Sequence, residues 1–96
     1  MSAHQPQYTH HQSYRLRGGD AYELVAWMDG EFTPVVSALP NYVAYYGVAE
    51  DAETFVTVSK FTDRRAAAEA NRRGREWLAR RFPDMVITPL RFFWSS

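Results

Sequence analysis

YVAYYGVAEDAETFVTVSKFTDRRAAAEANRRGREWLARRF, residues 42–82, is the stretch that decides the fold. Segments 42–48 and 54–61 are rich in β-branched and aromatic residues and flank a short acidic turn, a pattern that predicts a β-hairpin. Asp63 then stands where a helix N-cap belongs, and Pro83 ends the helix that follows. The stretch therefore predicts strand, turn, strand and helix in immediate succession.

The helix after Asp63 has a stripe of small and apolar residues at intervals of three and four, which is the spacing of a buried helical face. The stripe consists of Ala67, Ala70, Gly74, Trp77 or Leu78, and Phe82. Residues 85–94 follow as a last predicted strand. Pro89 lies within it, and since proline cannot donate to a sheet ladder, this strand is expected at an edge or with a bulge.

Before the hairpin, residues 8–17 alternate loosely and predict a first strand, which Gly18-Gly19 ends. Asp20 and Glu23 resemble a capping box, and apolar residues continue at helical spacing to Leu39. Pro34 falls inside this helix, which predicts a kink there or a restart with Thr33 as the cap.

Residues 1–9 are polar and are interpreted as a flexible tail, so that residues 10–96 form a single domain. The predicted order is β-α-β-β-α-β, a ferredoxin-like α+β fold with two helices on one face of a four-stranded antiparallel sheet. The hairpin strand YVAYYGV is apolar on both of its sides. An uncovered apolar sheet face usually marks an interface, so a homodimer formed sheet to sheet is expected.

Composition narrows the class of protein. The 96 residues are 46% hydrophobic and 16% aromatic with a formal net charge of zero, which is typical of a folded domain without general attraction to nucleic acid or membrane. There is no cysteine, no long apolar run and no signal-like N-terminus, so a cytoplasmic protein is expected. Ten arginines against one lysine suggest a bacterial, GC-rich source.

Charge is unevenly divided along the chain. Residues 20–53 carry seven acids and no base, a formal −7, whereas residues 60–82 carry eight bases and three acids, a formal +5. Two interpretations stay open. The arginine-rich helix pairs with acids of the first helix across their seam, or it presents a nucleic-acid patch, which would need aromatic residues beside the arginines.

Few residues offer catalytic chemistry by type alone. The three histidines, His4, His10 and His11, fall in or beside the predicted tail without convergent partners, so no metal site is predicted. The rest of the domain has neither histidine nor cysteine, which excludes Ser-His-Asp and Cys-His arrangements there.

Residues 20–94 resemble the antibiotic-biosynthesis-monooxygenase-like branch of the dimeric α/β-barrel superfamily. The features that carry the resemblance are Leu39-Pro40-Asn41-Tyr42, Tyr45-Tyr46, Ser59-Lys60-Phe61, Asp63 to Arg72, and Trp77. Asn41 stands where the family has glycine, and asparagine also adopts left-handed backbone conformations. Haem-degrading members of the superfamily use a histidine on the second helix, which this chain lacks.

The resemblance implies a cofactor-independent monooxygenase for an aromatic, polyphenolic small molecule. The alternative is a non-catalytic ligand-binding or dimerisation module of the same fold. Related enzymes bind substrate between the helices and the sheet, which implies Asn71 and Trp77 as catalytic residues and Tyr45, Tyr46, Trp27 and Arg91 as pocket residues. Trp77 is also interpretable as a core residue. The small residues Ala67, Ala70 and Gly74 are interpretable either as room for a ligand or as a means of close packing between the helix and the sheet.

Overall fold

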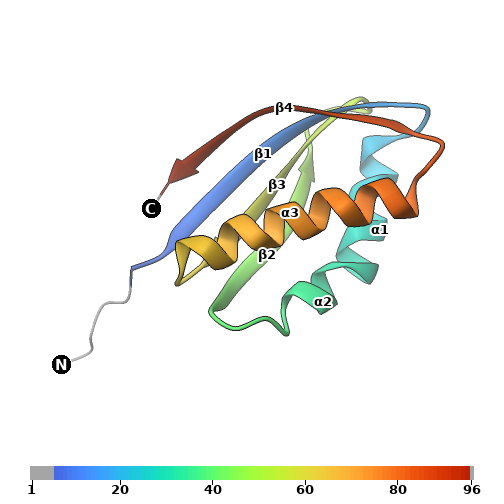
Figure 1. Cartoon of the computed structure of the whole chain (residues 1–96). Coiled ribbons are helices and arrows are strands. Elements are labelled where there is room, and N and C mark those ends of the chain that lie inside the picture. Colours follow the sequence, from blue (N-terminus) through green and yellow to red (C-terminus); the bar gives the residue numbers. More distant parts are fainter. Residues whose placement is uncertain (1–5, 96) are drawn as a thin grey trace.

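The computed structural model describes residues 6–95, which form four strands and three helices in the expected order (Figure 1). In chain order the elements are β1 (Tyr8–Arg17), α1 (Ala21–Glu31), α2 (Thr33–Val36), β2 (Tyr42–Ala49), β3 (Thr54–Phe61), α3 (Arg64–Arg81) and β4 (Val86–Ser95). The predicted β-α-β-β-α-β order is confirmed, with the first helix divided into α1 and α2. None of the described helices is long and apolar enough to cross a membrane.

The sheet has the order β2-β3-β1-β4, and every neighbouring pair is antiparallel. The helices lie on one of its faces, with α3 against β1 and β3 and α1 against β2 (Figure 1). Tyr14 of β1 lies opposite Phe55 of β3, and Leu16 lies opposite Ile87 of β4. These inward-facing side chains form the core with apolar residues of the helices. The ferredoxin-like architecture is therefore confirmed.

Local capping determines where the helices begin. The Asp20 carboxylate accepts a hydrogen bond from the Tyr22 N–H at 3.1 Å, and the Asp63 carboxylate accepts one from the Ala66 N–H at 2.9 Å. The predicted restart at Pro34 is confirmed, with Pro34 in the first turn of α2. The residue preceding α2 is Phe32, however, and not Thr33, which is already helical.

The turn into β2 depends on Asn41, whose φ is 68°, in the left-handed region. Its carbonyl oxygen accepts the Thr62 N–H at 2.9 Å, and its side-chain oxygen accepts the Thr62 hydroxyl at 3.2 Å. Asparagine tolerates this conformation better than most residues. Asn41 therefore serves where glycine was expected from the resemblance.

β4 begins at Val86, one residue later than predicted, and is an edge strand. Its pairing with β1 shifts register between Gln12 and Tyr14, where Pro89 lies opposite Tyr14. Both expectations for Pro89, an edge position and a bulge, are confirmed.

β1 corrects the interpretation of the N-terminus. The strand starts at Tyr8, so it includes two residues assigned to the tail, because its ladder with β3 extends to the pair Tyr8 and Phe61. His10 and His11 are strand residues, and His10 is buried. Two of the histidines expected in or beside the tail are therefore part of the folded domain. Residues 1–5, including His4, lie outside the described part of the chain.

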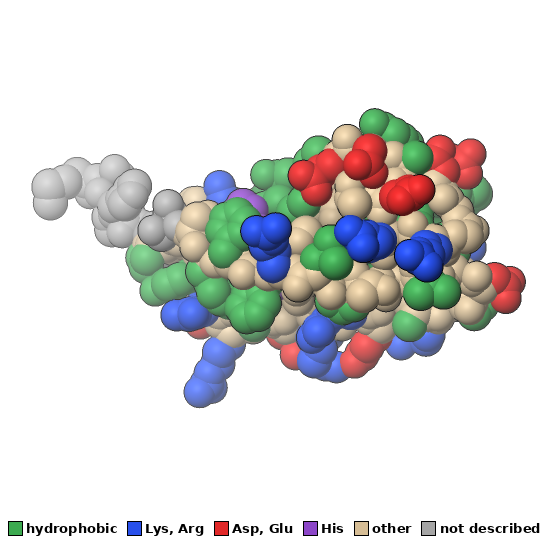
Figure 2. All heavy atoms as spheres, turned by 90° about the horizontal axis from the view of Figure 1, so that it is seen from above, with side chains coloured by type: hydrophobic (Ala, Val, Ile, Leu, Met, Phe, Trp, Pro, Cys, Tyr) green, Lys and Arg blue, Asp and Glu red, His purple; other side chains and the backbone are tan. Residues whose placement is uncertain are grey.

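The face of the sheet that carries no helices, here called the open face, exposes large apolar side chains. Tyr46, Val48 and Phe93 are 45%, 50% and 55% exposed. In the view of Figure 2, apolar and basic side chains spread across the surface, most acidic ones gather toward the upper right, and others lie along the lower edge beside basic ones. The two-sided apolar character predicted from the hairpin sequence is thus present at these residues.

The expected charge pairing between the helices is mostly absent. Of the four ion pairs among the described residues, only Arg81–Glu31, at 2.8 Å, joins α3 to α1. The others link Arg72 and Arg73 to Glu69 and Glu76 within α3. The reason is geometric. Three of the seven acids of residues 20–53 belong to the β2–β3 turn, at the end of the sheet, where Asp51 and Glu53 lie beside Arg15 and Arg17 of β1 and not beside α3.

Candidate functional site

Four polar side chains lie buried between α3 and the sheet. His10 from β1, Thr57 and Ser59 from β3, and Asn71 from α3 form what we call the buried polar cluster; none is more than 6% exposed. One nitrogen or oxygen of each side chain lacks a hydrogen-bond partner within the described chain: His10 Nδ1, Thr57 Oγ1, Ser59 Oγ and Asn71 Oδ1. Buried polar atoms are normally paired, so this group marks the polar region of an otherwise apolar layer.

Two tyrosines border this cluster. Tyr45 of β2 is 3% exposed, and its hydroxyl donates to the Met28 Sδ at 3.8 Å. Tyr14 of β1 is also buried, with its ring stacked on Phe55 at 5.0 Å between centroids. Burial raises the pKa of both phenols well above the ordinary value, although the Arg75 charge partly opposes this for Tyr14. Both are therefore hydrogen-bond donors at neutral pH.

His10 is enclosed by aromatic rings of β4. Phe92 stacks on its imidazole at 5.4 Å between centroids, and Trp94 meets it edge-on at 4.8 Å. Burial, and then the neighbouring charges of His11 and Arg75, lower the pKa of His10. The imidazole is consequently neutral at pH 7 and retains one nitrogen able to accept a proton.

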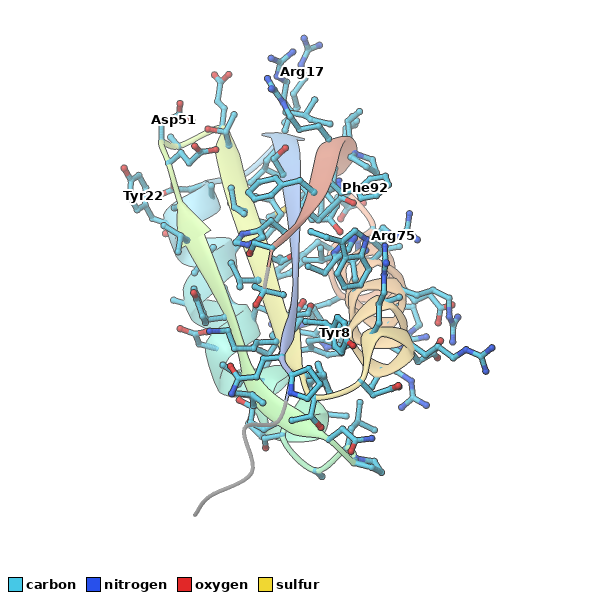
Figure 3. The ribbon with its side chains drawn as sticks, turned by 90° about the vertical axis from the view of Figure 1, so that its left-hand side faces the viewer. Tyr8, Arg17, Tyr22, Asp51, Arg75 and Phe92 are labelled. Carbon is cyan, nitrogen blue, oxygen red and sulfur yellow. The ribbon has the colours of Figure 1, made fainter. Side chains whose placement is uncertain are left out.

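A cavity of about 240 Å³ opens between α3 and β4; we call it the α3–β4 cavity. Its apolar wall consists of Leu78, Ala79, Phe82, Pro83, Met85, Ile87 and Pro89. Tyr14 and Arg75 contribute the polar side chains of the lining. In Figure 3, Arg75 extends from α3 on the side of the molecule where Phe92 of β4 lies. The cavity thus combines an apolar wall with one phenol and one guanidinium, a composition typical of small-molecule sites.

No family model matches the chain, and no curated protein matches it in sequence. Solved structures do match. A monooxygenase from the gene ActVA-Orf6 of Streptomyces coelicolor, solved with the ligand Nanaomycin D, has a TM-score of 0.67 and 15% identity over 96% of this chain and 88% of that one. SnoaB, a cofactor-independent oxygenase from Streptomyces nogalater, has a TM-score of 0.65 and 15% identity over 94% and 91%.

The fold is that of these oxygenases. The resemblance to antibiotic-biosynthesis-monooxygenase-like proteins is confirmed at the level of fold. The alpha subunit of aIF2 from Pyrococcus abyssi shares it too, with a TM-score of 0.74 and 13% identity. That match covers 92% of this chain, which spans only 35% of the subunit's length. One fold thus serves unrelated tasks, and function must be argued from the side chains.

Two of the implied site residues lie under α3. Asn71 is buried in the polar cluster. Tyr45 lies on the helix-covered face, with its hydroxyl against Gly74. Trp77 lies apart from them, half-buried, with its ring 5.5 Å from Phe32 and 5.7 Å from Phe82 between centroids. Neither Asn71 nor Trp77 lines the α3–β4 cavity.

The other three implied residues lie elsewhere. Tyr46 lies on the open face because adjacent strand residues point to opposite sides, and Tyr45 takes the inner one. Trp27 is 50% exposed on α1, beneath the Arg81 guanidinium at 4.9 Å. Arg91 is exposed at the bulge of β4, where its carbonyl oxygen accepts hydrogen bonds from Gln12 and Ser13 side chains. Tyr46, Trp27 and Arg91 thus lie apart from the buried polar cluster, and none of them lines the α3–β4 cavity.

Sequence reasoning missed His10, Tyr14 and Arg75. A signal was present in β1, where alternate positions from His10 to Leu16 point to one face and His10 and Gln12 interrupt its apolar character. Arg75 gave no local signal, since it is one of several arginines on α3. The described residues contain no group of three or more His, Asp or Glu side chains placed to hold a metal ion.

Proposed function

We propose that this chain is a small homodimeric, monooxygenase-like protein that binds a planar aromatic, polyphenolic molecule and oxidises it with dioxygen, without metal or flavin. The observation that carries the proposal is the α3–β4 cavity, with its apolar wall and its two polar residues, Tyr14 and Arg75. Such a space accepts a flat ring system and orients its oxygens. The fold shared with two oxygenases supports the choice of reaction.

In the proposed reaction a deprotonated substrate supplies the electrons. For an anthrone, one oxygen atom of dioxygen replaces the two hydrogens of the central CH₂ group as a carbonyl, and the other leaves as water with those hydrogens. The contribution of the protein is orientation and stabilisation of developing negative charge. The Arg75 guanidinium and the protonated Tyr14 hydroxyl are suited to that second task, since both donate hydrogen bonds.

Asn71 and Trp77 remain proposed catalytic residues. Asn71 is the better placed of the two, because its Oδ1 is buried without a partner beneath α3. A substrate hydroxyl that reached the buried polar cluster would satisfy this atom, and neutral His10 would accept the proton. Trp77 packs against Phe32 on the flank of α3 opposite to the cavity. Its proposed contribution to catalysis is therefore to hold α3 in position.

A second candidate is binding without turnover. It is favoured by the positions of Asn71 and Trp77, neither of which lines the cavity. Oxygen consumption with anthrone separates the two candidates. An oxygenase consumes one dioxygen for each anthraquinone formed, faster than the protein-free solution, and Tyr14→Phe with Asn71→Ala slows the reaction. Saturable binding of anthrone with the protein-free oxidation rate would support the second candidate and overturn the first.

The homodimer is the remaining part of the proposal. The open face exposes Tyr46, Val48, Leu90 and Phe93, each between 45% and 55%. Burial of apolar surface is worth roughly 25 cal/mol per Å², so two such faces gain by covering one another. A contiguous patch of this kind on a small domain usually marks an interface.

A further inference from the structure

Arg75 differs from the other arginines of α3. Arg72, Arg73 and Arg81 each form an ion pair, and the Arg64 guanidinium lies over the Trp94 ring at 4.6 Å. Among the described residues, Arg65, Arg75 and Arg80 of α3 are in none of the four ion pairs. Of these three, only Arg75 lines the α3–β4 cavity. A cation at the entrance of an apolar space is therefore available to an anion from outside the chain.

The exposed side chain of Arg75 lines the cavity close to the sheet residues that face α3. Its positive charge contributes to the lowered pKa of His10 and partly opposes the rise that burial causes in the pKa of Tyr14. These residues are four apart on β1, which corresponds to about 13 Å along a strand. Both neighbours are uncharged at pH 7, so neither neutralises the Arg75 charge.

From this arrangement we infer that the α3–β4 cavity recognises an aromatic carboxylic acid, whose carboxylate binds Arg75 and whose ring lies against the apolar wall. The inference rests on the proposed function and narrows its substrate class from any planar aromatic to an anionic one. A guanidinium presents paired N–H donors that match the two oxygens of a carboxylate. Tyr14 adds a second polar side chain to the lining, on the sheet side of the same space.

The size of the cavity agrees with such a ligand. An apolar cavity of about 150 Å³ is enough to bind benzene. The α3–β4 cavity, at about 240 Å³, has room for a fused two-ring body. Phe82, Met85 and Ile87 offer aromatic and flexible apolar contacts to its faces. A two-ring carboxylate such as 2-naphthoate is therefore a suitable probe.

The experiment compares 2-naphthoate with neutral 2-naphthalenemethanol by titration calorimetry under nitrogen, so that no oxidation takes place. We expect Arg75→Met to weaken 2-naphthoate binding roughly tenfold or more, the range for losing a hydrogen bond to a charged group, and Arg75→Lys to weaken it less. The affinity for 2-naphthalenemethanol stays unchanged in both variants. Arg65→Met is the control, because Arg65 is also an exposed arginine of α3 but does not line the cavity. We expect it to leave the affinities for both probes unchanged.

Three results would overturn the inference: no 2-naphthoate binding at millimolar concentration, equal affinity of the wild-type chain for both probes, or equal losses in Arg75→Met and Arg65→Met. Circular dichroism confirms that each variant is folded. The result is separate from that of the oxygenase assay. Binding of 2-naphthoate that depends on Arg75, without anthrone oxidation, would uphold the carboxylate site and refute catalysis. Anthrone oxidation without a preference for 2-naphthoate would uphold catalysis and refute the carboxylate site.

Discussion

At the scale of single residues, the contact between Gly74 and Tyr45 controls how closely α3 approaches the sheet. A Cβ atom at position 74 would lie 2.6 Å from the Tyr45 hydroxyl oxygen, well inside contact distance. The Tyr45 ring is held by Phe32, edge-on at 5.3 Å between centroids, so it has little freedom to move away. The glycine of the small-residue stripe is thus used for close packing, one of the two uses expected from sequence.

Gly74→Ala should lower the free energy of unfolding by about 1–3 kcal/mol, the usual cost of overpacking, in spite of the better helix propensity of alanine. Urea denaturation followed by circular dichroism measures it. Gly30→Ala in α1 is the matched control, because nothing lies within 4 Å of its added Cβ, and it should be neutral or stabilising. Adding Tyr45→Phe to Gly74→Ala removes the clashing oxygen and should restore stability. A Gly74→Ala variant as stable as wild type would refute the contact.

His10 makes the stability depend on pH. Because its pKa is lowered in the folded chain, chiefly by burial, the unfolded state binds a proton first as the pH falls below about 6.5. The stabilisation is therefore complete above that pH and is lost as the pH falls toward the folded pKa. The urea midpoint of the wild-type chain should decrease as the pH is lowered from 7.5 to 5.5. The decrease should be smaller in His10→Phe. His11→Gln should retain most of the decrease, since His11 is only partly buried. An unchanged slope in His10→Phe would contradict this.

At the scale of elements, the start of α3 is set by the side chain of Asp63, which caps the helix directly after an extended segment. Asp63 has φ −130° and ψ 131°, and its carboxylate accepts the Ala66 N–H. Arg80 and Arg81 occupy the last turn, where positive charge favours the helix dipole. The boundaries of α3 are therefore set by local interactions.

Asp63→Ala should lower the free energy of unfolding by about 1 kcal/mol, the usual value of an N-cap. Asp63→Asn keeps the side-chain acceptor and should cost much less. Thermal unfolding of the three proteins at low ionic strength compares them. If Asp63→Asn loses as much as Asp63→Ala, the charge of Asp63 and not its capping hydrogen bond is what stabilises α3.

Such local signals explain why the elements could be predicted from sequence and why most of the site could not. Asp20, Asp63 and Pro34 cap or start a helix through contacts with residues next to them in the chain, and the alternation of residues 8–17 predicted β1. Which side Tyr45 and Tyr46 take depends on the register of β2 with β3, a long-range property. Likewise, Arg75 became distinguishable from other arginines only once β4 was placed beside α3. The site depends on pairings that a single sequence does not reveal.

At the scale of the whole molecule, the sheet is covered on one face and open on the other. The open face carries exposed apolar side chains from β2 and β4, beside partly buried ones of β3. Basic residues lie at the end of the sheet, including Arg15 and Arg17 of β1 beside the β2–β3 turn (Figure 3). Self-association through this face would bury the apolar side chains and leave the charged ones at its rim.

Sedimentation equilibrium at micromolar concentration should accordingly give twice the chain mass of 11.1 kDa. Tyr46→Glu and Phe93→Glu place a carboxylate on the open face and should shift the mass to that of one chain, because a charge buried without a partner is costly. Tyr22→Glu is the control. Tyr22 is 57% exposed, but it lies on α1 in the helical layer, so its substitution should leave the dimer intact. A mass near 11.1 kDa for the wild-type chain, or dissociation by Tyr22→Glu as readily as by Phe93→Glu, would refute an interface on the open face.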